Sequence, residues 1–444
     1  MTAPGDWPHF DGRLRFDNHS REAAGDDFGH IVRTRPVAVL EAASEQDVAQ
    51  LLRFAPTAGL RVAPRGQGHS THGQAQAPGG IVLDLSGFDR IHALGPGRAT
   101  VEAGVRWFDI AIASLKNGML PPVLTDYLGL SIGGTLSVGG VSGTSFWYGA
   151  QVDHVDSLVV ATGTGDIVTC GPDREAQLFE GVLAGLGQCG VILRATLRLV
   201  AAAPVVRVFR LTYPHPPAMI SDLRLLAVEE RFDYLLGIVT PSEGGGWDAQ
   251  IEAMTSNPGP DDGRLAGLRD LAAARRVDDR PQALWVRRVE ERVAALQAMG
   301  LWGRPHPWLD LFVPAPAADR LLADVLATPV TRGVGPLRIL LYPLRRSRVG
   351  RPLLRLPEDD VSFLLDVLCT AGPAPGAVGK MVAANRVLFE RCRELGGTLY
   401  PIGAVPLTPA DWERHFGPQW DHLAAAKRRF DPEGVLTPGP GIFP

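Results

Sequence analysis

A glycine-rich loop that ends in a histidine is the part of this 444-residue chain best suited to a reaction. Residues 65–76 are RGQGHSTHGQAQ, so that His69 directly follows the spaced pair Gly66 and Gly68. Alternating glycines expose successive backbone N–H groups, which form a concave site for phosphate oxygens. The loop indicates an anion site with an imidazole beside it. A surface turn carrying an ordinary histidine is the alternative.

The loop differs from the known phosphate-binding signatures. Thr71 stands where the third glycine of a Rossmann fingerprint would be, and the similar stretch at Gly163 has Val168 in that place. A P-loop is excluded at Lys380, because Met381 follows it and Ala374 replaces the first glycine.

A second glycine-rich segment covers residues 126–150, DYLGLSIGGTLSVGGVSGTSFWYGA. Its seven glycines are threaded through an apolar run, which excludes a flexible linker. Glycines inside an apolar run indicate that the backbone approaches something closely. We interpret the partner as a large flat ligand.

The elements that would position these segments follow from hydrophobic periodicity. Short strands alternate with helices from 37 to 200, including a hairpin over 155–170, a helix that begins at 44–47, and helices over 106–116 and 175–186. The pattern of predicted helices and strands changes at Pro204. We place a second domain of mixed helices and strands over 203–399. The tail over 400–444 contains a helical stretch, PADWERHFGPQWDHLAAAKRRF.

Composition narrows the class of protein. The net charge is −4, 45% of residues are apolar, and the basic residues form no cationic run, so we expect no nucleic-acid partner. We expect a soluble cytoplasmic protein, since no signal peptide or membrane-spanning run is visible. The four cysteines are far apart, and the histidines have no ligand spacing, so neither a disulfide framework nor a metal site is expected.

Six segments together resemble the FAD-linked oxidases of the vanillyl-alcohol-oxidase superfamily, and within it the cytokinin dehydrogenases. They are RGQGHSTHGQAQAPGGIVLDL, TDYLGLSIGGTLSVGGVSG, GLGQCGVILRA, HPWLDLFVP, LLYPLRRS and FDPEGVLTPG, in the family's order. The resemblance implies an α+β, two-domain PCMH-type FAD-binding fold. Its FAD-binding domain would comprise residues 1–202 and the returning tail 400–444, with the substrate domain 203–399 inserted between them.

The resemblance also assigns roles at the cofactor. It implies FAD bonded covalently through its 8α-methyl group to His69, with no second bond from a cysteine. The other residues that would bind FAD are Gly66, Gln67, Gly68, Ser70, Gln74, Tyr127, Ser131, Ser137, Val141, Val191, Tyr400 and Thr437. Pro440 departs from the family pattern, because it removes an amide that would contact the flavin.

Asp126 matches the family's active-site aspartate, which would take a proton while hydride leaves the adjacent carbon of the substrate. A helix or turn cap is the alternative role for a Thr-Asp pair. Trp308, Leu309 and Asp310 would line the substrate cavity. Leu236 stands where plant cytokinin dehydrogenases commonly have glutamate, so the identity of the small-molecule substrate stays open.

The resemblance therefore implies hydride transfer from a C–N or C–O bond to FAD, with O2 or a quinone-like compound as electron acceptor. Two alternatives remain. One is a reductase of the same fold that uses noncovalent FAD and NADPH, and the other is a flavin-free binding protein.

Overall fold

A small, mainly parallel sheet begins the fold, and the computed structural model describes residues 7–257, 259, 261–328 and 337–443 of the chain. The strand order is β1-β2-β4-β3, with β2, β4 and β3 parallel. The helix α2 (Glu45–Thr57) connects β2 to β3 and begins as predicted, because the Ser44 hydroxyl accepts the Asp47 N–H and caps it. The strands are β1 (Arg13–Arg15), β2 (Ala38–Glu41), β3 (Val62–Arg65) and β4 (Ile81–Asp84).

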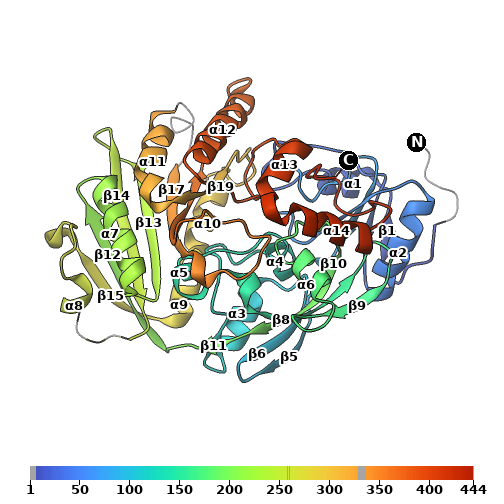
Figure 1. The fold of residues 1–444 in the computed structure, drawn as a ribbon, viewed down its shortest axis with the longest axis horizontal. Coiled ribbons are helices and arrows are strands. Elements are labelled where there is room, and N and C mark those ends of the chain that lie inside the picture. Colours follow the sequence, from blue (N-terminus) through green and yellow to red (C-terminus); the bar gives the residue numbers. More distant parts are fainter. Residues whose placement is uncertain (1–6, 258, 260, 329–336, 444) are drawn as a thin grey trace.

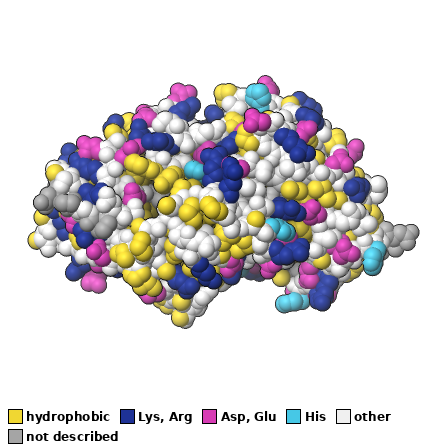
Figure 2. Space-filling model, turned by 90° about the horizontal axis from the view of Figure 1, so that it is seen from below, with side chains coloured by type: hydrophobic (Ala, Val, Ile, Leu, Met, Phe, Trp, Pro, Cys, Tyr) yellow, Lys and Arg dark blue, Asp and Glu magenta, His cyan; other side chains and the backbone are white. Residues whose placement is uncertain are grey.

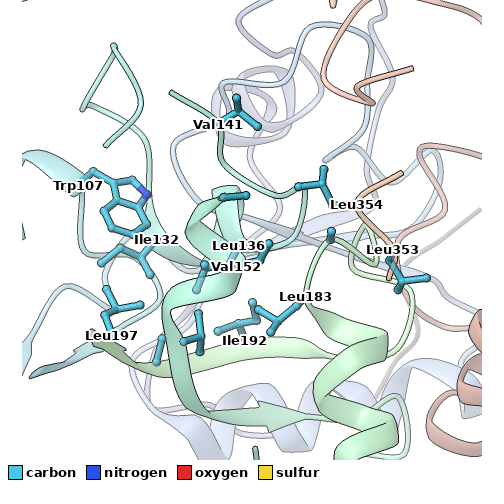
Figure 3. Close-up of a cluster of buried hydrophobic side chains, with 14 of the residues drawn as sticks. Trp107, Ile132, Leu136, Val141, Val152, Leu183, Ile192, Leu197, Leu353 and Leu354 are labelled. Carbon is cyan, nitrogen blue, oxygen red and sulfur yellow. The ribbon is translucent and has the colours of Figure 1, made fainter. Parts of the chain in front are cut away.

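A five-stranded antiparallel sheet follows, in the order β5-β6-β10-β8-β9. The predicted hairpin is confirmed, since β8 and β9 pair antiparallel with Leu158 opposite Cys170. Helices α3 and α4 pack here, and Figure 3 shows Trp107, Ile132 and Leu197 within one buried cluster. The elements are β5 (Ile91–Gly95), β6 (Arg98–Glu102), β8 (Val155–Ala161), β9 (Ile167–Cys170), β10 (Val191–Arg198), α3 (Trp107–Leu115) and α4 (Ile132–Leu136).

The third sheet has eight antiparallel strands in the order β15-β12-β14-β13-β17-β18-β16-β19. It uses residues from 205 to 399 and begins with β12 over 205–213. The strands are β12 (Val205–Tyr213), β13 (Tyr234–Pro241), β14 (Trp247–Thr255), β15 (Arg276–Pro281), β16 (Leu309–Pro314), β17 (Arg338–Arg345), β18 (Val361–Leu368) and β19 (Thr398–Leu399).

The two faces of this sheet have different neighbours. Helices α7 (Pro216–Glu229), α11 (Ala318–Ala327) and α12 (Ala377–Glu394) share one core with aliphatic residues such as Leu311 and Leu365. The opposite face, which includes Phe312 and Tyr342, joins the core of the N-terminal half. The functional residues should therefore lie on this second face, between the two halves that Figure 1 shows side by side.

The tail returns to the first sheet at β3, and Figure 1 draws its red ribbon in the same half of the molecule as the blue N-terminal elements. Val62 donates its N–H to Val435 O at 2.8 Å, and Thr437 donates to Val62 O at 2.9 Å. The helical stretch predicted in the tail is two helices, α13 (Pro409–Phe416) and α14 (Trp420–Phe430). They are separated because Gly417 has a φ of 50° and Pro418 has no N–H to donate.

Shorter elements complete the chain. The predicted helix over 175–186 ends early, because Ala184 and Leu186 have left-handed backbone with φ of 56° and 54°. The remaining elements are α1 (Asn18–Ala24), β7 (Met119–Leu120), α5 (Ser145–Tyr148), α6 (Ala176–Val182), β11 (Val200–Ala201), α8 (Asp262–Leu265), α9 (Gln282–Val286) and α10 (Glu290–Ala298).

The surface carries both charges. On the face seen in Figure 2, basic and acidic side chains alternate with hydrophobic ones, consistent with a net charge of −4. Within the described ranges, none of the helices has both the length and the apolar character needed to cross a bilayer.

Candidate active site

The glycine-histidine loop follows β3 and is held tightly at both glycines. A Cβ on Gly66 would overlap the Ser131 hydroxyl, and Gly68 has a φ of 63° with the Arg65 guanidinium against it. Arg65 in turn donates to Asp26 O at 2.6 Å. Both positions require glycine, and the loop presents its backbone next to Ser131, a residue also predicted to bind FAD.

His69 lies in an aromatic cluster. Its ring stacks on Phe28 with centroids 4.0 Å apart and lies 4.8 Å from Tyr127 and 5.9 Å from Trp302. Burial, with a smaller contribution from His306, lowers the pKa of His69 to about 3. The imidazole is therefore neutral near pH 7 and keeps a nitrogen lone pair that can act as a nucleophile.

The next residues leave a polar atom without a partner. Ser70 Oγ is buried and has no hydrogen bond of normal geometry to the residues that the structure describes, although it lies close enough to the Asp27 carboxyl to lower that group's pKa. Asp27 accepts the N–H groups of Gly73 at 2.7 Å and Gly29 at 3.1 Å, and burial raises its pKa to about 6. An unpartnered hydroxyl beside two glycines fits a cofactor phosphate or ring edge, so the loop fits FAD.

The second glycine-rich segment corrects part of our interpretation. Most of its glycines pack against the protein itself: a Cβ on Gly133 would lie 2.8 Å from that of Ala103, and one on Gly143 would overlap the Tyr234 ring. Gly134 is different, because it is exposed and an added Cβ would meet only Ser131 Oγ, at 3.0 Å. Close backbone approach to a flat ligand therefore explains Gly134 and not the whole segment.

Asp126 is held by side chains of the eight-stranded sheet and of the α9–α10 segment. Tyr234 on β13 donates its hydroxyl to Oδ1, and Tyr342 on β17 donates to Oδ2, both at 2.9 Å. Arg288 forms an ion pair with Oδ1. These contacts replace the backbone N–H groups that a helix cap would bind, so the geometry does not support the capping role.

Arg288 links Asp126 to further groups. Its guanidinium lies 4.3 Å from the Trp285 ring centroid and 4.8 Å from that of Tyr234, and donates to Tyr234 Oη at 3.0 Å. Its Nε lies 3.9 Å from Glu252. Burial raises the pKa of Tyr234 and of Tyr342 well above the ordinary value, so both hydroxyls stay protonated and donate to Asp126.

Two further carboxyls face each other on neighbouring strands. Asp310 on β16 pairs in register with Asp366 on β18, and the residues are 1% and 8% exposed. Burial raises the pKa of Asp310 to about 7, and burial together with Asp310 raises that of Asp366 well above its usual range. Near neutral pH the pair therefore shares a proton.

The remaining predicted residues are spread around this centre. Tyr400 Oη accepts the Gly140 N–H at 3.0 Å, and Gln74 Nε2 donates to Gly403 O at 3.4 Å. Ser137 Oγ donates to Gly133 O at 2.8 Å. Gln67 is exposed, whereas Val141 and Val191 are 6% and 2% exposed and pack in the core.

Thr437 has an unusual backbone. Its φ of 52° is rare for a β-branched residue, and its hydroxyl donates to Gly187 O at 2.8 Å. Such conformations cluster at ligand sites, which agrees with the predicted contact to FAD. Pro440 still contributes its carbonyl, which accepts the Trp412 indole N–H at 2.9 Å.

The sequence did not single out several residues that the structure brings to the site. They lack a local motif: Phe28 and Trp302 lie in loops, and Asp366 is a lone acid in an apolar strand. That lone acid was a usable signal, because a charge inside an apolar run needs a partner. The residues missed are Phe28, Asp27, Tyr234, Glu252, Arg288, Trp302, Tyr342 and Asp366.

Comparison with known proteins defines the class first. The sequence model described as "FAD binding domain" matches residues 36–171, and "Cytokinin dehydrogenase 1, FAD and cytokinin binding" matches residues 268–443. The solved structure of 6-hydroxy-D-nicotine oxidase from Arthrobacter nicotinovorans superposes with a TM-score of 0.75 at 22% identity, covering 98% of each chain. The fold is thus the two-domain PCMH-type fold, and the protein is an FAD-dependent oxidoreductase.

Full-length relatives give the family. Cytokinin dehydrogenase 7 from Oryza sativa subsp. japonica is 34% identical over 97% of this chain and 91% of its own length. An "Uncharacterized oxidoreductase ORF5 in fasciation locus" from Rhodococcoides fascians is 40% identical over 94% of this chain and 96% of its own. The chain belongs to the cytokinin dehydrogenase family.

The carboxyl pair gives a pH-dependent stability. The raised pKa of Asp310 means that the native protein holds a proton which the unfolded chain releases near its model value of 3.8. The stability that this proton contributes is then fully present below that value and is lost as the pH rises through about 7. Asp310→Asn has no carboxyl to lose this proton. The difference in Tm between Asp310→Asn and the native protein should therefore shift in favour of the variant by about 2–4 °C when the pH is raised from 5 to 8.

Thermal denaturation followed by circular dichroism at the two pH values measures this. Asp324→Asn is the control, because its side chain is 42% exposed on α11 and should change the pH dependence little. Parallel pH profiles for Asp310→Asn and the native protein would contradict the shared proton.

Proposed function

We propose that the protein oxidises a C–N or C–O bond of a small molecule, with FAD bonded covalently to His69 and Asp126 as the base. The observation that carries the proposal is the adjacency of Asp126 and Tyr127. The Tyr127 ring lies against His69, while Asp126 faces the phenols of the eight-stranded sheet. The proposed base, Asp126, is thus the neighbour in sequence of Tyr127, which contacts the proposed attachment point, His69.

The loop residues would hold the cofactor. Gly66, Gln67, Gly68 and Ser70 would bind the pyrophosphate and ring edge through N–H groups and the free hydroxyl. FAD, when bound, supplies the hydride acceptor. Two features of His69 support a covalent bond to FAD. Its imidazole is neutral, and it lies beside an aromatic ring of the kind against which a flat flavin can pack.

Asp126 would receive the proton at a particular atom. A carboxylate has about four lone-pair positions. Oδ1 accepts from Tyr234 and Arg288, whereas among the described residues Tyr342 alone donates to Oδ2. The free position on Oδ2 is then the acceptor for the substrate N–H or O–H proton. Arg288 positions the carboxylate through its ion pair with Oδ1.

The other two functions make different demands on His69. A reductase with noncovalent FAD and NADPH needs an unbonded His69, and a flavin-free binding protein needs no nucleophile there. O2 or a quinone-like compound would be the electron acceptor of the proposed oxidoreductase, and a screen with oxygen and with a dye separates these acceptors.

The covalent bond predicts flavin that stays with the polypeptide. On a denaturing gel, the purified protein should show flavin fluorescence, and His69→Ala should lose it because the nucleophile is gone. His72→Ala is the matched control, since this histidine lies in the same loop and should leave the fluorescence unchanged. Flavin released by acid from the native protein would instead support the reductase, and colourless protein the binding function.

Asp126→Asn should keep the flavin and lose the base. The flavin absorbance should be retained, while its anaerobic reduction by a substrate found in the screen slows by at least about tenfold. Stopped-flow spectroscopy measures this rate. Asp109→Asn, which removes a 40% exposed carboxylate at the start of α3, serves as the control and should reduce at the native rate. Equal rates in Asp126→Asn and the native protein would refute the role.

Substrate preference should differ from that of the plant relatives. Leu236 lies opposite Glu252 across β13 and β14, but Glu252 already contacts Arg210 at 3.5 Å and Arg288 at 3.9 Å. A free carboxylate to hold a purine is therefore missing at this position. We expect isopentenyladenine to be oxidised slowly or not at all, measured with a dye acceptor. Leu236→Glu should raise the rate and Leu236→Gln should not. Rapid oxidation by the native protein would show that the leucine is tolerated.

A further inference from the structure

We propose that Phe28 is a positioning residue, which holds the His69 imidazole in the orientation that it needs to bond to FAD. The inference rests on the covalent bond proposed above and names a residue that controls how fast this bond forms. Phe28 acts through His69 and not on the substrate.

The His69 imidazole has no polar anchor in the part of the chain that the structure describes. None of these residues hydrogen-bonds to its ring nitrogens, and the shift of its pKa comes from burial and from His306 alone. By contrast, His154 Nε2 binds the Tyr148 carbonyl at 2.7 Å. A hydrogen bond of this kind usually fixes the tautomer and orientation of a histidine. The orientation of His69 therefore depends on the rings packed around it.

Phe28 supplies the closest and most nearly parallel of these rings. Its centroid lies 4.0 Å from that of His69 with an interplanar angle of 24°, whereas Tyr127 lies at 4.8 Å and 33°. Trp302 is farther away, at 5.9 Å. The ring of His306 stacks on Phe28 as well, with centroids 4.4 Å apart and an angle of 5°. A ring has two faces, so each imidazole covers one of them and Phe28 is the middle of a three-ring column.

The backbone fixes Phe28 beside the loop that carries His69. Phe28 donates its N–H to Gly68 O at 3.0 Å. Gly29 donates to Ser70 O at 3.1 Å, so that two consecutive residues pair with the two neighbours of the histidine. A Cβ on Gly29 would overlap the backbone of the loop, so this close approach requires glycine. The loop therefore holds the stacking ring and the imidazole in one local framework.

The far end of the column is held by the chain that leads into β16. His306 is 3% exposed and donates its N–H to Gly29 O at 2.9 Å. Its ring is oriented by Nε2, which lies 3.2 Å from Trp302 O. Phe28, itself 8% exposed, is thus clamped between the glycine-histidine loop and His306. The ring cannot turn to follow the imidazole, so it acts on His69 as a fixed surface.

The chemistry of the bond shows why this orientation matters. A nitrogen of the His69 imidazole bonds to the 8α carbon of FAD, and the new bond replaces the imidazole N–H proton and one hydrogen of the methyl group. Two protons and two electrons therefore leave, and O2 that accepts them becomes H2O2. The nitrogen must face that carbon at close range, and a ring that rotates freely about its side-chain bonds spends only part of its time in this position.

The test measures how fast flavin becomes attached in the full-length protein. Cells are sampled at intervals after induction, and acid precipitation of the purified protein separates attached from released flavin. Phe28→Leu should bind as much total flavin as the native protein but attach it about three- to tenfold more slowly, as expected for the loss of one stacked aromatic pair. Phe28→Tyr keeps the ring and should attach flavin at nearly the native rate. Phe16→Leu is the control, because Phe16 is 42% exposed and lies outside the column.

Total flavin and the Tm from circular dichroism separate positioning from a structural effect. A structural role would lower both quantities, whereas loss of positioning lowers only the rate of attachment. If Phe28→Leu binds less flavin than the native protein, Phe28→Met gives the same comparison, because its flexible side chain fills the volume without a ring.

Three results would overturn the role of Phe28. Both non-aromatic variants attach flavin at the native rate, or Phe28→Tyr is slowed as much as they are, or all three lose total flavin, which would make Phe28 a direct cofactor contact. The native protein separates these results from a failure of the proposed bond. If acid releases all of its flavin, the bond to His69 is refuted and the inference falls with it, whereas attached flavin with unaffected variants refutes the role of Phe28 alone.

Discussion

The ion pair and hydrogen bonds around Asp126 join the two halves of the protein. The aspartate lies before α4 in the N-terminal half. Tyr234 and Tyr342 come from strands of the eight-stranded sheet, and Arg288 comes from the α9–α10 segment. Arg288 is only 13% exposed at its side chain, so breaking the pair would leave a buried charge unpaired at a cost of about 3–5 kcal/mol. The same contacts therefore fix the interface between the halves and the orientation of the proposed base.

The eight-stranded sheet explains why the polar groups gather there. Its helix-covered face is aliphatic, with Leu311, Leu341 and Leu365 almost fully buried. Because side chains alternate, each of these strands must present its other residues to the N-terminal half. Tyr234, Tyr342 and Asp366 occupy these alternate positions. A single sheet thus forms an aliphatic core on one side and, on the other, a wall of apolar side chains with a few buried polar groups among them.

Local patterns in the sequence predicted much of the fold but little of this wall. Strand alternation gave the hairpin of β8 and β9, and the cap at Ser44 marked the start of α2. The partners of Asp126 are 108, 162 and 216 residues away along the chain, so no window contains both sides of a contact. The glycines of 126–150 misled for a related reason, because their close neighbours are distant residues such as Ala103 and Tyr234.

The resemblance to a family located His69 and Asp126, yet it could not reveal how charge is arranged around them. Leu236 is an apolar residue on β13, and Glu252 across from it contacts Arg210 and Arg288. A carboxylate that is already paired offers little to a ligand, because its lone pairs and its charge are engaged. Asp310 and Asp366 lie on the same sheet face, on β16 and β18, where they share a proton with each other. The carboxyls of this face are thus engaged with other protein groups, Glu252 with arginines and the pair of Asp310 and Asp366 with each other.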